Sequence, residues 1–582
     1  MLFPVSLVLL LSLSSCTSLT TSESDPSDHA LSSIISPVTL AADSSDPSIV
    51  NIPTLGSVRG VLNSLAREFR AIPYASPPFR FTAPVSPLPW NGIRDATVDG
   101  PGCMQTCTEP LGVCPASVSE DCLLVNIFTP LTATSASRLP VIVFLHGGAF
   151  RDGFGGGELY NGTYLASGGV PAIVVTVSYR LGSFGFLYGA GGNDAAAPSG
   201  NYGLLDQRQA LIFVQAHIAA FGGDKTRVTL WGQSAGSMSV AAHLIAPASA
   251  GLFAAAALDS EPLALPFRDT ESAHALYNAV VDAAGCQSAI SPGTCLLALT
   301  SSQLLAAQNI AAKNISVDVP FSLLQAFVPF TPTTGTPDTP NAPLASFQGV
   351  SGAAPVADVP IVITTVKSEG TIFIYEGFGA PLSPVDYTLT LAVIFGTSAA
   401  VRVEAQYPAP PDAVDLRALT ANVTTAMLFR CASRNATRLL AAAPGRRSPI
   451  YLGEWARLIS WAPALWTNAT KAYEACWTNV CHAQELPFLF FPQLPGRTEW
   501  TEEDIVLSSA GRSYLTTFAA SAGMSMGDGT TNDDNVTPLI WPSLDGNTGA
   551  TPRMTLDAPV RRIDDADDEA CALWNQIGYD FY

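Results

Sequence analysis

The sequence predicts an α/β protein whose mostly parallel sheet is covered by helices on both faces. Apolar runs typical of buried strands, at residues 139–145, 173–178 and 359–366, alternate with stretches that are compatible with helices. The sharpest local pattern lies at residues 228–246, where β-prone residues lead into a Gly-Gln-Ser-Ala-Gly turn and then a helix-compatible run. With 582 residues, the chain can bury a large core.

The first 48 residues are expected to precede the folded domain, which we assign to residues 49–582. Residues 1–18 contain an apolar run followed by small residues and resemble a signal peptide, although no lysine or arginine precedes the run. Residues 19–48 are rich in Ser, Asp, Thr and Pro, a composition typical of a disordered leader. A bacterial lipid-attachment site at Cys16 is an alternative that the glycosylation motifs described next disfavour.

Charge, glycosylation motifs and cysteines together indicate a secreted protein. The net charge of −20, with only four lysines, argues against nucleic-acid binding and against charge-driven binding to anionic membranes. No run after the leader is expected to span a bilayer, so we expect no stable membrane insertion. Eleven cysteines less Cys16 leave ten, which could all form disulfide bonds in an oxidising compartment. Six Asn-x-Ser/Thr motifs favour a glycoprotein on a eukaryotic secretory route: Asn161, Asn314, Asn422, Asn435, Asn468 and Asn535.

Ser234, at the apex of the Gly-Gln-Ser-Ala-Gly turn, is the predicted nucleophile. The pattern Gly-x-Ser-x-Gly between a strand and a helix is typical of a nucleophile elbow. Gly232 and Gly236 suit a turn in which the neighbouring chain lies too close for side chains. The strained turn lifts the serine hydroxyl above the sheet, and the N-terminus of the following helix favours developing negative charge.

A second motif, His-Gly-Gly-Ala-Phe at residues 146–150, directly follows the strand predicted at residues 139–145. Backbone N–H groups after such a strand can point at the oxygen of a tetrahedral intermediate, and glycines let the backbone approach a substrate closely. We therefore predict an oxyanion hole with the N–H groups of Gly147 and Gly148 as donors and that of Ala235 as the third. A glycine-rich loop without this role is the alternative.

Several segments together resemble the type-B carboxylesterase family, which includes cholinesterases, carboxylesterases and some fungal lipases. The resemblance implies the α/β-hydrolase fold, one large domain with a large mixed, mostly parallel central sheet flanked by helices. It also implies hydrolysis of a small carboxylic ester by a serine esterase, without a metal or another cofactor. It extends from about residue 56 to the C-terminus and rests on residues 69–75, 120–123, 146–148, 178–182, 203–207, 221–224 and 232–236.

His482 is the predicted general base. In the implied fold the chain order is nucleophile, acid, histidine. The other five histidines lie before the predicted nucleophile or too soon after it: His29, His146, His217, His243 and His274. The resemblance to the family at residues 481–488 also points to His482.

Glu369 is the predicted acid of the triad. It lies just beyond the buried strand at residues 359–366, where sheets of this kind place catalytic groups. This pattern alone leaves Glu376 open, whereas the family's glutamate before a glycine corresponds to Glu369. The resemblance implies that Ser234 attacks the ester, His482 takes and returns the proton, and Glu369 orients the imidazole.

Three departures from the family bear on the substrate and the site. Gln233 replaces the common glutamate before the serine, which removes a negative charge and makes the site less attractive to cations. Glu261 replaces a usual glycine after Ser260, a serine that could support the histidine indirectly. The loop between Cys103 and Cys122 lacks the tryptophan that holds choline in cholinesterases, so a choline ester is not the expected substrate.

Two alternative functions stay open at this stage. A lipase acting on acylglycerols would share every motif of the predicted site. Some relatives have lost the catalytic residues and serve adhesion or binding, but this chain retains the serine, the glutamate, the histidine and both glycines.

The resemblance also implies disulfides and ion pairs. The family's pairings carry over as Cys103–Cys122, Cys286–Cys295 and Cys431–Cys571. The four remaining cysteines are expected to pair as Cys107–Cys114 and Cys476–Cys481. The last pair would close a small loop beside the predicted base and stiffen its position. The ion pairs expected from the matched motifs are Arg80–Glu120 and Arg180–Asp206.

Overall fold

The computed structural model describes residues 46–582 apart from 110–111, 191–193, 319–327, 467–470, 495–497, 528–538, 545–550, 564–568 and 580–582. The signal peptide predicted at residues 1–18, and the leader predicted at 19–48 up to residue 45, lie outside the described residues. The first strand, β1 (Ile49–Ile52), pairs with β2 (Gly56–Arg59), which in turn pairs with β5 (Ile93–Asp95).

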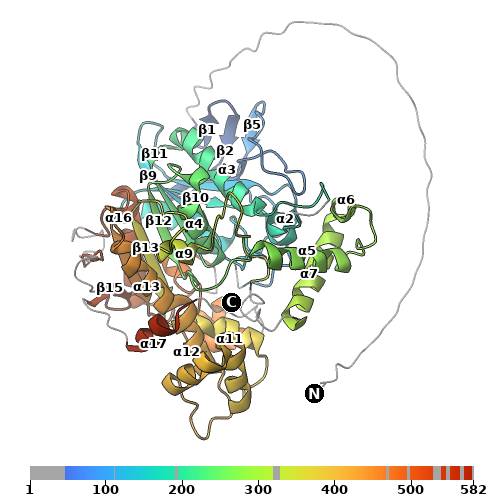
Figure 1. Cartoon of the computed structure of the whole chain (residues 1–582). Helices are drawn as coiled ribbons and strands as arrows, with labels where there is room; N and C mark the ends of the chain where they lie inside the picture. The colour runs from blue at the N-terminus through green and yellow to red at the C-terminus, as the bar shows by residue number, and fades with distance from the viewer. Residues whose placement is uncertain are drawn as a thin grey trace. The chain divides into compact units, whose positions relative to one another are not determined.

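An 11-stranded sheet forms the centre of the folded domain (Figure 1). The six neighbouring pairs from β15 to β10 are parallel, and the four pairs at the two edges are antiparallel. The predicted mixed, mostly parallel sheet is therefore confirmed. The strands follow one another across the sheet in this order: β16 (Arg561–Ile563), β15 (Arg553–Leu556), β14 (Ile450–Trp455), β13 (Ile361–Val366), β12 (Ala255–Asp259), β11 (Gly223–Gln233), β9 (Leu139–Leu145), β10 (Ile173–Val177), β8 (Leu124–Pro130), β4 (Ala66–Pro73) and β3 (Val61–Leu62).

Alternating side chains of the central strands supply two cores, one on each face of the sheet. In β9, Val143 belongs to the core that includes residues of α4 (Ala235–Ile245). Its neighbour Phe144 belongs to the other core, which includes residues of α16 (Glu502–Ala520). Both side chains are completely buried, so the central strands are covered by helices on both faces, as predicted.

Helices connect the parallel strands, because a parallel pair needs a long crossover. The remaining α-helices are α1 (Thr163–Ser167), α2 (Gly182–Phe186), α3 (Tyr202–His217), α5 (Thr270–Ala283), α6 (Pro292–Ala298), α7 (Ser301–Asp318), α9 (Pro343–Phe347), α10 (Gly370–Gly377), α11 (Pro384–Gln406), α12 (Arg417–Thr424), α13 (Cys431–Ala441), α14 (Ala462–Leu465), α15 (Leu486–Phe490) and α17 (Glu569–Ile577). Short turns of 3₁₀- or π-helix are η1 (Glu158–Tyr160), η2 (Ile218–Phe221), η3 (Pro247–Ser249), η4 (Thr425–Arg430) and η5 (Lys471–Trp477), and two short strands are β6 (Gly102–Cys103) and β7 (Val118–Ser119).

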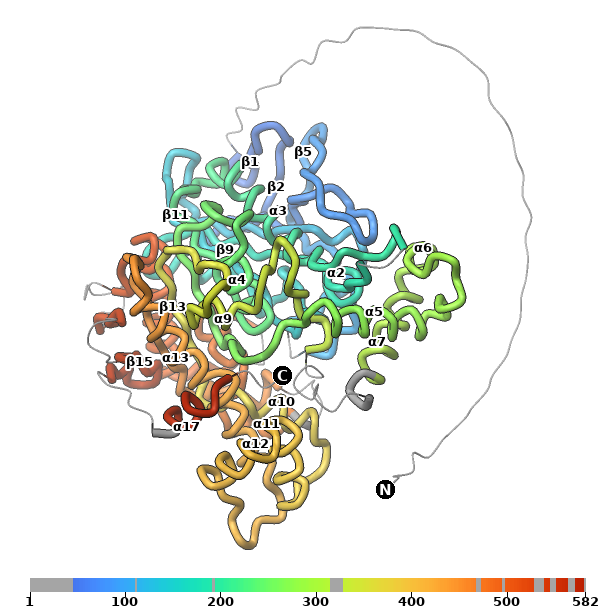
Figure 2. The backbone as a smooth tube through the Cα atoms, in the orientation of Figure 1, coloured from blue at the N-terminus to red at the C-terminus, as the bar shows by residue number. Residues whose placement is uncertain are grey.

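Helix α11, drawn beside α12 in Figures 1 and 2, corrects one expectation. By length and composition it could cross a membrane, with a mean hydropathy of 1.3 over a window that is 22% buried. The prediction that no run after the leader meets this criterion is therefore wrong. Between Asp386 and Arg402 the helix contains no charged residue. However, Gly396, with φ of 73°, interrupts the helical backbone, and Tyr387 is buried against the domain.

Five disulfides tie segments of the domain together, and they join the pairs expected from the sequence. Their Cα atoms are 5.0–5.7 Å apart, within the range that a disulfide bond allows. The Cys431–Cys571 bond links α13 to α17 across 140 residues. The Cys476–Cys481 bond closes a short loop immediately before His482.

Both ion pairs expected from the sequence are present, and they differ in burial. Arg180 Nε lies 2.8 Å from Asp206 Oδ2, and the two side chains are 4% and 0% exposed. Arg80 Nε lies 3.2 Å from Glu120 Oε2, with side chains that are 10% and 25% exposed. Both predictions are confirmed, and only the first pair is fully inside the protein.

Candidate active site

Ser234 lies between β11 and α4, at the carboxyl end of the central strands. Its backbone, with φ of 56° and ψ of −123°, is strained for a residue with a side chain. A Cβ atom on Gly232 would lie 2.2 Å from the Gly236 oxygen, and one on Gly236 would lie 2.0 Å from the Leu145 oxygen. Glycine is therefore required at both positions, because only a residue without a side chain lets these backbone segments approach each other.

Glu369 and His482 come together across 113 residues of sequence. The segment that carries His482 reaches the end of β13 because the Ser368 N–H donates to the Val480 oxygen at 3.0 Å. His482 Nδ1 then lies 2.6 Å from Glu369 Oε2, while Glu369 Oε1 accepts a hydrogen bond from the Val366 N–H at 2.7 Å. Both side chains are buried, so the orientation of the imidazole is fixed.

Aromatic rings and a disulfide surround the imidazole. The rings of Phe373 and Phe429 meet that of His482 edge to face, with centroids 5.0 and 5.5 Å away. The Cys476–Cys481 disulfide ends one residue before His482. These contacts restrict movement of the ring without adding charge beside it.

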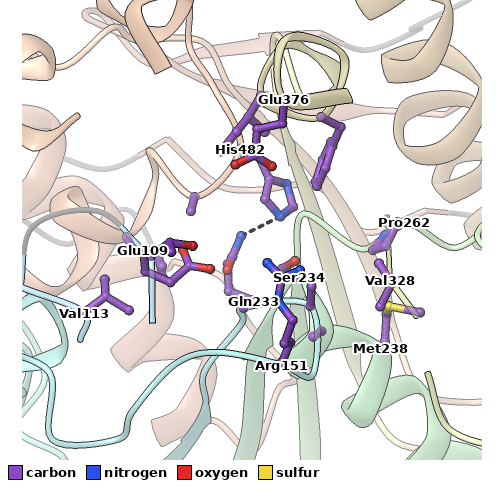
Figure 3. Close-up of a pocket in the computed structure, with 18 of the residues that line it drawn as sticks. Glu109, Val113, Arg151, Gln233, Ser234, Met238, Pro262, Val328, Glu376 and His482 are labelled. Carbon is purple, nitrogen blue, oxygen red and sulfur yellow. Dashed lines mark hydrogen bonds between the residues drawn. The ribbon is translucent and has the colours of Figure 1, made fainter. Parts of the chain in front are cut away.

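Gln233 contacts the histidine in a way that the sequence did not predict. Its Nε2 atom lies 3.2 Å from His482 Nε2 (Figure 3). Within the described part of the chain, the Ser234 hydroxyl makes no hydrogen bond with His482, although both residues line the same cavity. The sequence predicts only a lost charge at position 233, because nothing in the neighbouring residues indicates a contact with a residue 249 positions away.

The three predicted oxyanion donors lie around Ser234. A Cβ atom on Gly147 would come within 3.0 Å of the Ser234 Cβ atom, so this backbone passes directly beside the serine. Gly148 has φ of 102° and, like Ala235, lines the cavity. Among the described residues, no hydrogen bond uses the N–H groups of these three residues, so they remain able to donate to a bound substrate.

The cavity that contains Ser234 and His482 has a volume of about 120 Å³. Arg151, Glu109 and Glu376 supply its charged groups (Figure 3). Desolvation raises the pKa of Glu109 to about 8 and also raises that of Glu376. The pKa of Asp152, which pairs with Arg151 at 3.2 Å, is likewise raised by burial, to about 6. Apolar lining comes from Met238, Leu265, Val328, Ile372, Leu428 and Leu486.

Two further carboxyl groups, those of Glu261 and Glu485, are buried, and their surroundings could not be predicted from the sequence. Glu261 accepts a hydrogen bond from the Ser237 hydroxyl, and burial raises its pKa to about 8. Ser260, a serine that could support the histidine indirectly, donates at 3.4 Å to Glu485, which lies three residues after His482 in the sequence. A glutamate at a position where the family has glycine was the one available signal.

Burial of Glu261 predicts how stability depends on pH. The folded protein keeps this proton up to about pH 8, whereas the unfolded chain loses it near its ordinary pKa of 4.5. Stability is therefore lost as pH rises through this window. We expect Glu261→Gln to be about 2–4 kcal/mol more stable than wild type at pH 8.5, with a much smaller difference at pH 4.5. Urea unfolding at both pH values measures this, and a difference independent of pH would contradict it.

No group of three or more metal-ligating side chains occurs within the described ranges.

Comparisons with known proteins agree with the fold. The Carboxylesterase family profile matches residues 46–574. The crystal protein of Dictyostelium discoideum is 32% identical over 532 residues, covering 90% of each chain. The para-nitrobenzyl esterase of Bacillus subtilis is 45% identical over 214 residues, covering 35% of this chain and 42% of that one. A solved PNB esterase structure has a TM-score of 0.70 and 30% identity, covering 91% of this chain and 100% of that one.

The fold and these similarities define a carboxylic-ester hydrolase with the α/β-hydrolase architecture. The chain belongs to the carboxylesterase family.

Proposed function

We propose that this protein hydrolyses small carboxylic esters through an acyl-enzyme formed on Ser234, with His482 as general base and Glu369 as the orienting acid. The observation that carries the proposal is the 2.6 Å hydrogen bond between His482 Nδ1 and Glu369 Oε2, in the cavity that also contains Ser234. Glu376, the other acid left open by the sequence, lines the cavity but makes no hydrogen bond with His482 among the described residues.

In the proposed reaction, Ser234 Oγ attacks the ester carbonyl and His482 Nε2 accepts the hydroxyl proton. The N–H groups of Gly147, Gly148 and Ala235 donate to the oxyanion. Collapse of the intermediate breaks the bond to the alcohol, which leaves with the proton from His482. Water then attacks the acyl-enzyme by the same route and releases the acid, so no metal or cofactor is needed.

The proposed substrate is a small, uncharged ester. A cavity of about 120 Å³ favours short acyl chains over those of a typical lipase substrate. Gln233 contributes no charge that would attract a cationic alcohol. The alternative proposal is that the protein serves adhesion or binding, as some catalytically silent relatives do. This alternative requires that Ser234 be unreactive.

We further propose that the protein is a secreted glycoprotein without a stable membrane insertion. Five disulfides support an oxidising compartment. Of the glycosylation motifs, Asn314 and Asn422 are exposed in the structure, as glycan attachment requires.

A fluorophosphonate probe tests the assignment of the nucleophile. We expect one covalent label per chain, on Ser234, because an activated serine attacks phosphorus as it attacks an ester carbonyl. Intact-mass measurement and peptide mapping locate the label. Ser234→Ala should take none, whereas Ser183→Ala, which removes a buried hydroxyl elsewhere, should label normally. Folded wild-type protein that takes no label would favour the catalytically silent alternative.

A further inference from the structure

The cavity around Ser234 has two unlike sides. One side is apolar and includes Met238, Pro262 and Val328. Glu109 lies on the opposite side of the serine (Figure 3). An ester has two halves, an acyl group and an alcohol, and each half must occupy one part of the cavity. The difference between the two sides therefore bears on which acids and alcohols the cavity accepts.

The polar side presents both donors and acceptors of hydrogen bonds. Four residues that line the cavity form this polar wall: Glu109, Arg151, Glu376 and Tyr473. The Tyr473 hydroxyl donates to the Glu376 carboxyl group. Arg151 Nε donates to Asp152 Oδ2 at 3.2 Å, and among the described residues this is the only hydrogen bond of the guanidinium. The carboxyl group of Glu109 has no hydrogen-bond partner within the same residues, so the wall keeps donors and acceptors for a ligand.

Electrostatic interactions connect the members of the polar wall. Burial raises the pKa of Glu109 to about 8, and the positive charge of Arg151 opposes this rise. Burial likewise raises the pKa of Glu376, and Arg151 opposes that shift as well. Near pH 7 the Glu109 carboxyl group is therefore mostly uncharged, and in this form it both donates and accepts hydrogen bonds.

The polar wall lies on the side of the cavity where the alcohol must leave. In the proposed reaction His482 returns a proton to the alcohol, so the alcohol oxygen lies next to the imidazole. The Phe373 ring meets the imidazole with centroids 5.0 Å apart, and Glu376 lies three residues later in α10, on the same side of that helix. Gln233, whose amide contacts the imidazole, lies on the same side of the cavity as Glu109 (Figure 3).

We propose that the polar wall binds hydroxyl groups on the alcohol half of the substrate, so that the preferred ester joins a short acyl chain to a small polyhydroxylated alcohol. This inference rests on the proposed function of the cavity and names its class of substrate. A hydroxyl group both donates and accepts, which matches a wall that holds one guanidinium and two carboxyl groups. A cationic alcohol would be repelled by Arg151, and an anionic alcohol would lie against the two carboxyl groups. The volume of about 120 Å³ restricts the alcohol to a few carbon atoms.

Two pairs of acetate esters test the proposal by titration of the acetic acid released at pH 7. In the first pair, 1-acetylglycerol and propyl acetate differ only by two hydroxyl groups on the alcohol. We expect wild type to hydrolyse 1-acetylglycerol with a kcat/KM at least about tenfold higher, because its hydroxyl groups make hydrogen bonds to the polar wall that propyl acetate cannot make. In the second pair, acetylcholine and 3,3-dimethylbutyl acetate differ in charge, and the charged ester should have no advantage.

Substitutions of Glu109 show whether the preference comes from this wall. Glu109→Leu removes the carboxyl group at similar size. The ratio of kcat/KM for 1-acetylglycerol to that for propyl acetate should then fall by about five- to tenfold. Glu109→Gln keeps an acceptor and a donor without a charge, so its ratio should stay within about threefold of wild type. Each ratio is independent of the folded fraction of the variant, and thermal unfolding checks that each variant is folded.

Glu261→Leu is the matched control. Glu261 is also a buried glutamate whose pKa burial raises to about 8, but it lies outside the cavity. Its ratio of kcat/KM values should equal that of wild type, which separates recognition by the polar wall from a general effect of removing a buried carboxyl group.

Three results would overturn the proposal. Wild type could hydrolyse propyl acetate as efficiently as 1-acetylglycerol, or the preference could persist unchanged in Glu109→Leu. A preference for acetylcholine that is lost in Glu109→Gln would show that the wall binds a cation instead. Failure of the proposed function would differ from all three, because wild type would then hydrolyse none of the four esters and take no phosphonate label on Ser234.

Discussion

Replacing Ser234 or His482 with alanine is expected to lower kcat for a simple ester by about 10⁵- to 10⁶-fold, and Glu369→Gln by about 10⁴-fold. In the proposed mechanism, each substitution removes a group that acts in the same step: the attacking oxygen, the proton acceptor, or the carboxylate whose oxygen lies 2.6 Å from the acceptor's other ring nitrogen. Because the three act as a unit, the triple variant should lose no more than Ser234→Ala alone.

Matched variants separate this assignment from loss of folding. Glu376→Gln alters the other acid that lines the cavity, and we expect a loss below tenfold. His217→Ala alters a histidine outside the cavity and should leave turnover unchanged. Steady-state kinetics on folded variants give the comparison. Near-normal turnover by His482→Ala would exclude it as the base, and a larger loss in Glu376→Gln than in Glu369→Gln would exchange the two acids.

The parts of the site that could be predicted are those defined by local backbone geometry. Gly232 and Gly236 are needed wherever two backbones approach within contact distance, so the Gly-x-Ser-x-Gly turn can be recognised without a structure. Chain order and the position just after a buried strand then restricted the acid and the base. The choice between Glu369 and Glu376 needed the family resemblance, because both follow the same buried strand in the sequence.

The contacts that sequence could not predict join side chains far apart in the chain. The amide of Gln233 meets His482 across 249 residues, and Ser260 meets Glu485 across 225. Such contacts depend on how whole segments pack, whereas hydrophobic periodicity reports only which face of an element is buried. For the same reason, the comparison with the family showed that Glu261 replaces a usual glycine, but it did not indicate that the carboxyl group is buried.

Helix α11 shows a second limit of prediction from the sequence, which concerns membrane-spanning segments. Its three threonines, its serine and its glycine dilute the apolar residues, so the stretch does not form a continuous hydrophobic run. Averaged over a window it nevertheless reaches a mean hydropathy of 1.3, because its interior lacks charge. The mean hydropathy of this helix is therefore close to that of a membrane-spanning helix. The backbone break at Gly396 distinguishes it from a regular long helix.

Breaking the Arg180–Asp206 pair is expected to cause a large loss of stability, because both side chains are buried. The Asp206 carboxylate accepts hydrogen bonds from the Arg180 side chain at 2.7 and 2.8 Å and from its backbone N–H at 3.1 Å. Asp206→Ala would leave a buried guanidinium without its counter-charge. We expect the free energy of unfolding to fall by about 3–5 kcal/mol, measured by urea denaturation with the disulfides intact.

A double variant and the second ion pair show why the cost arises. In Asp206→Leu with Arg180→Met, no charge remains to be desolvated, so the double variant should recover much of the stability lost in Asp206→Ala. Glu120→Ala breaks the partly exposed pair with Arg80 and should cost about 1 kcal/mol or less. If Asp206→Ala lowered the free energy of unfolding no more than Glu120→Ala does, burial of the Arg180–Asp206 pair would not be what makes its loss costly. The prediction would then be wrong.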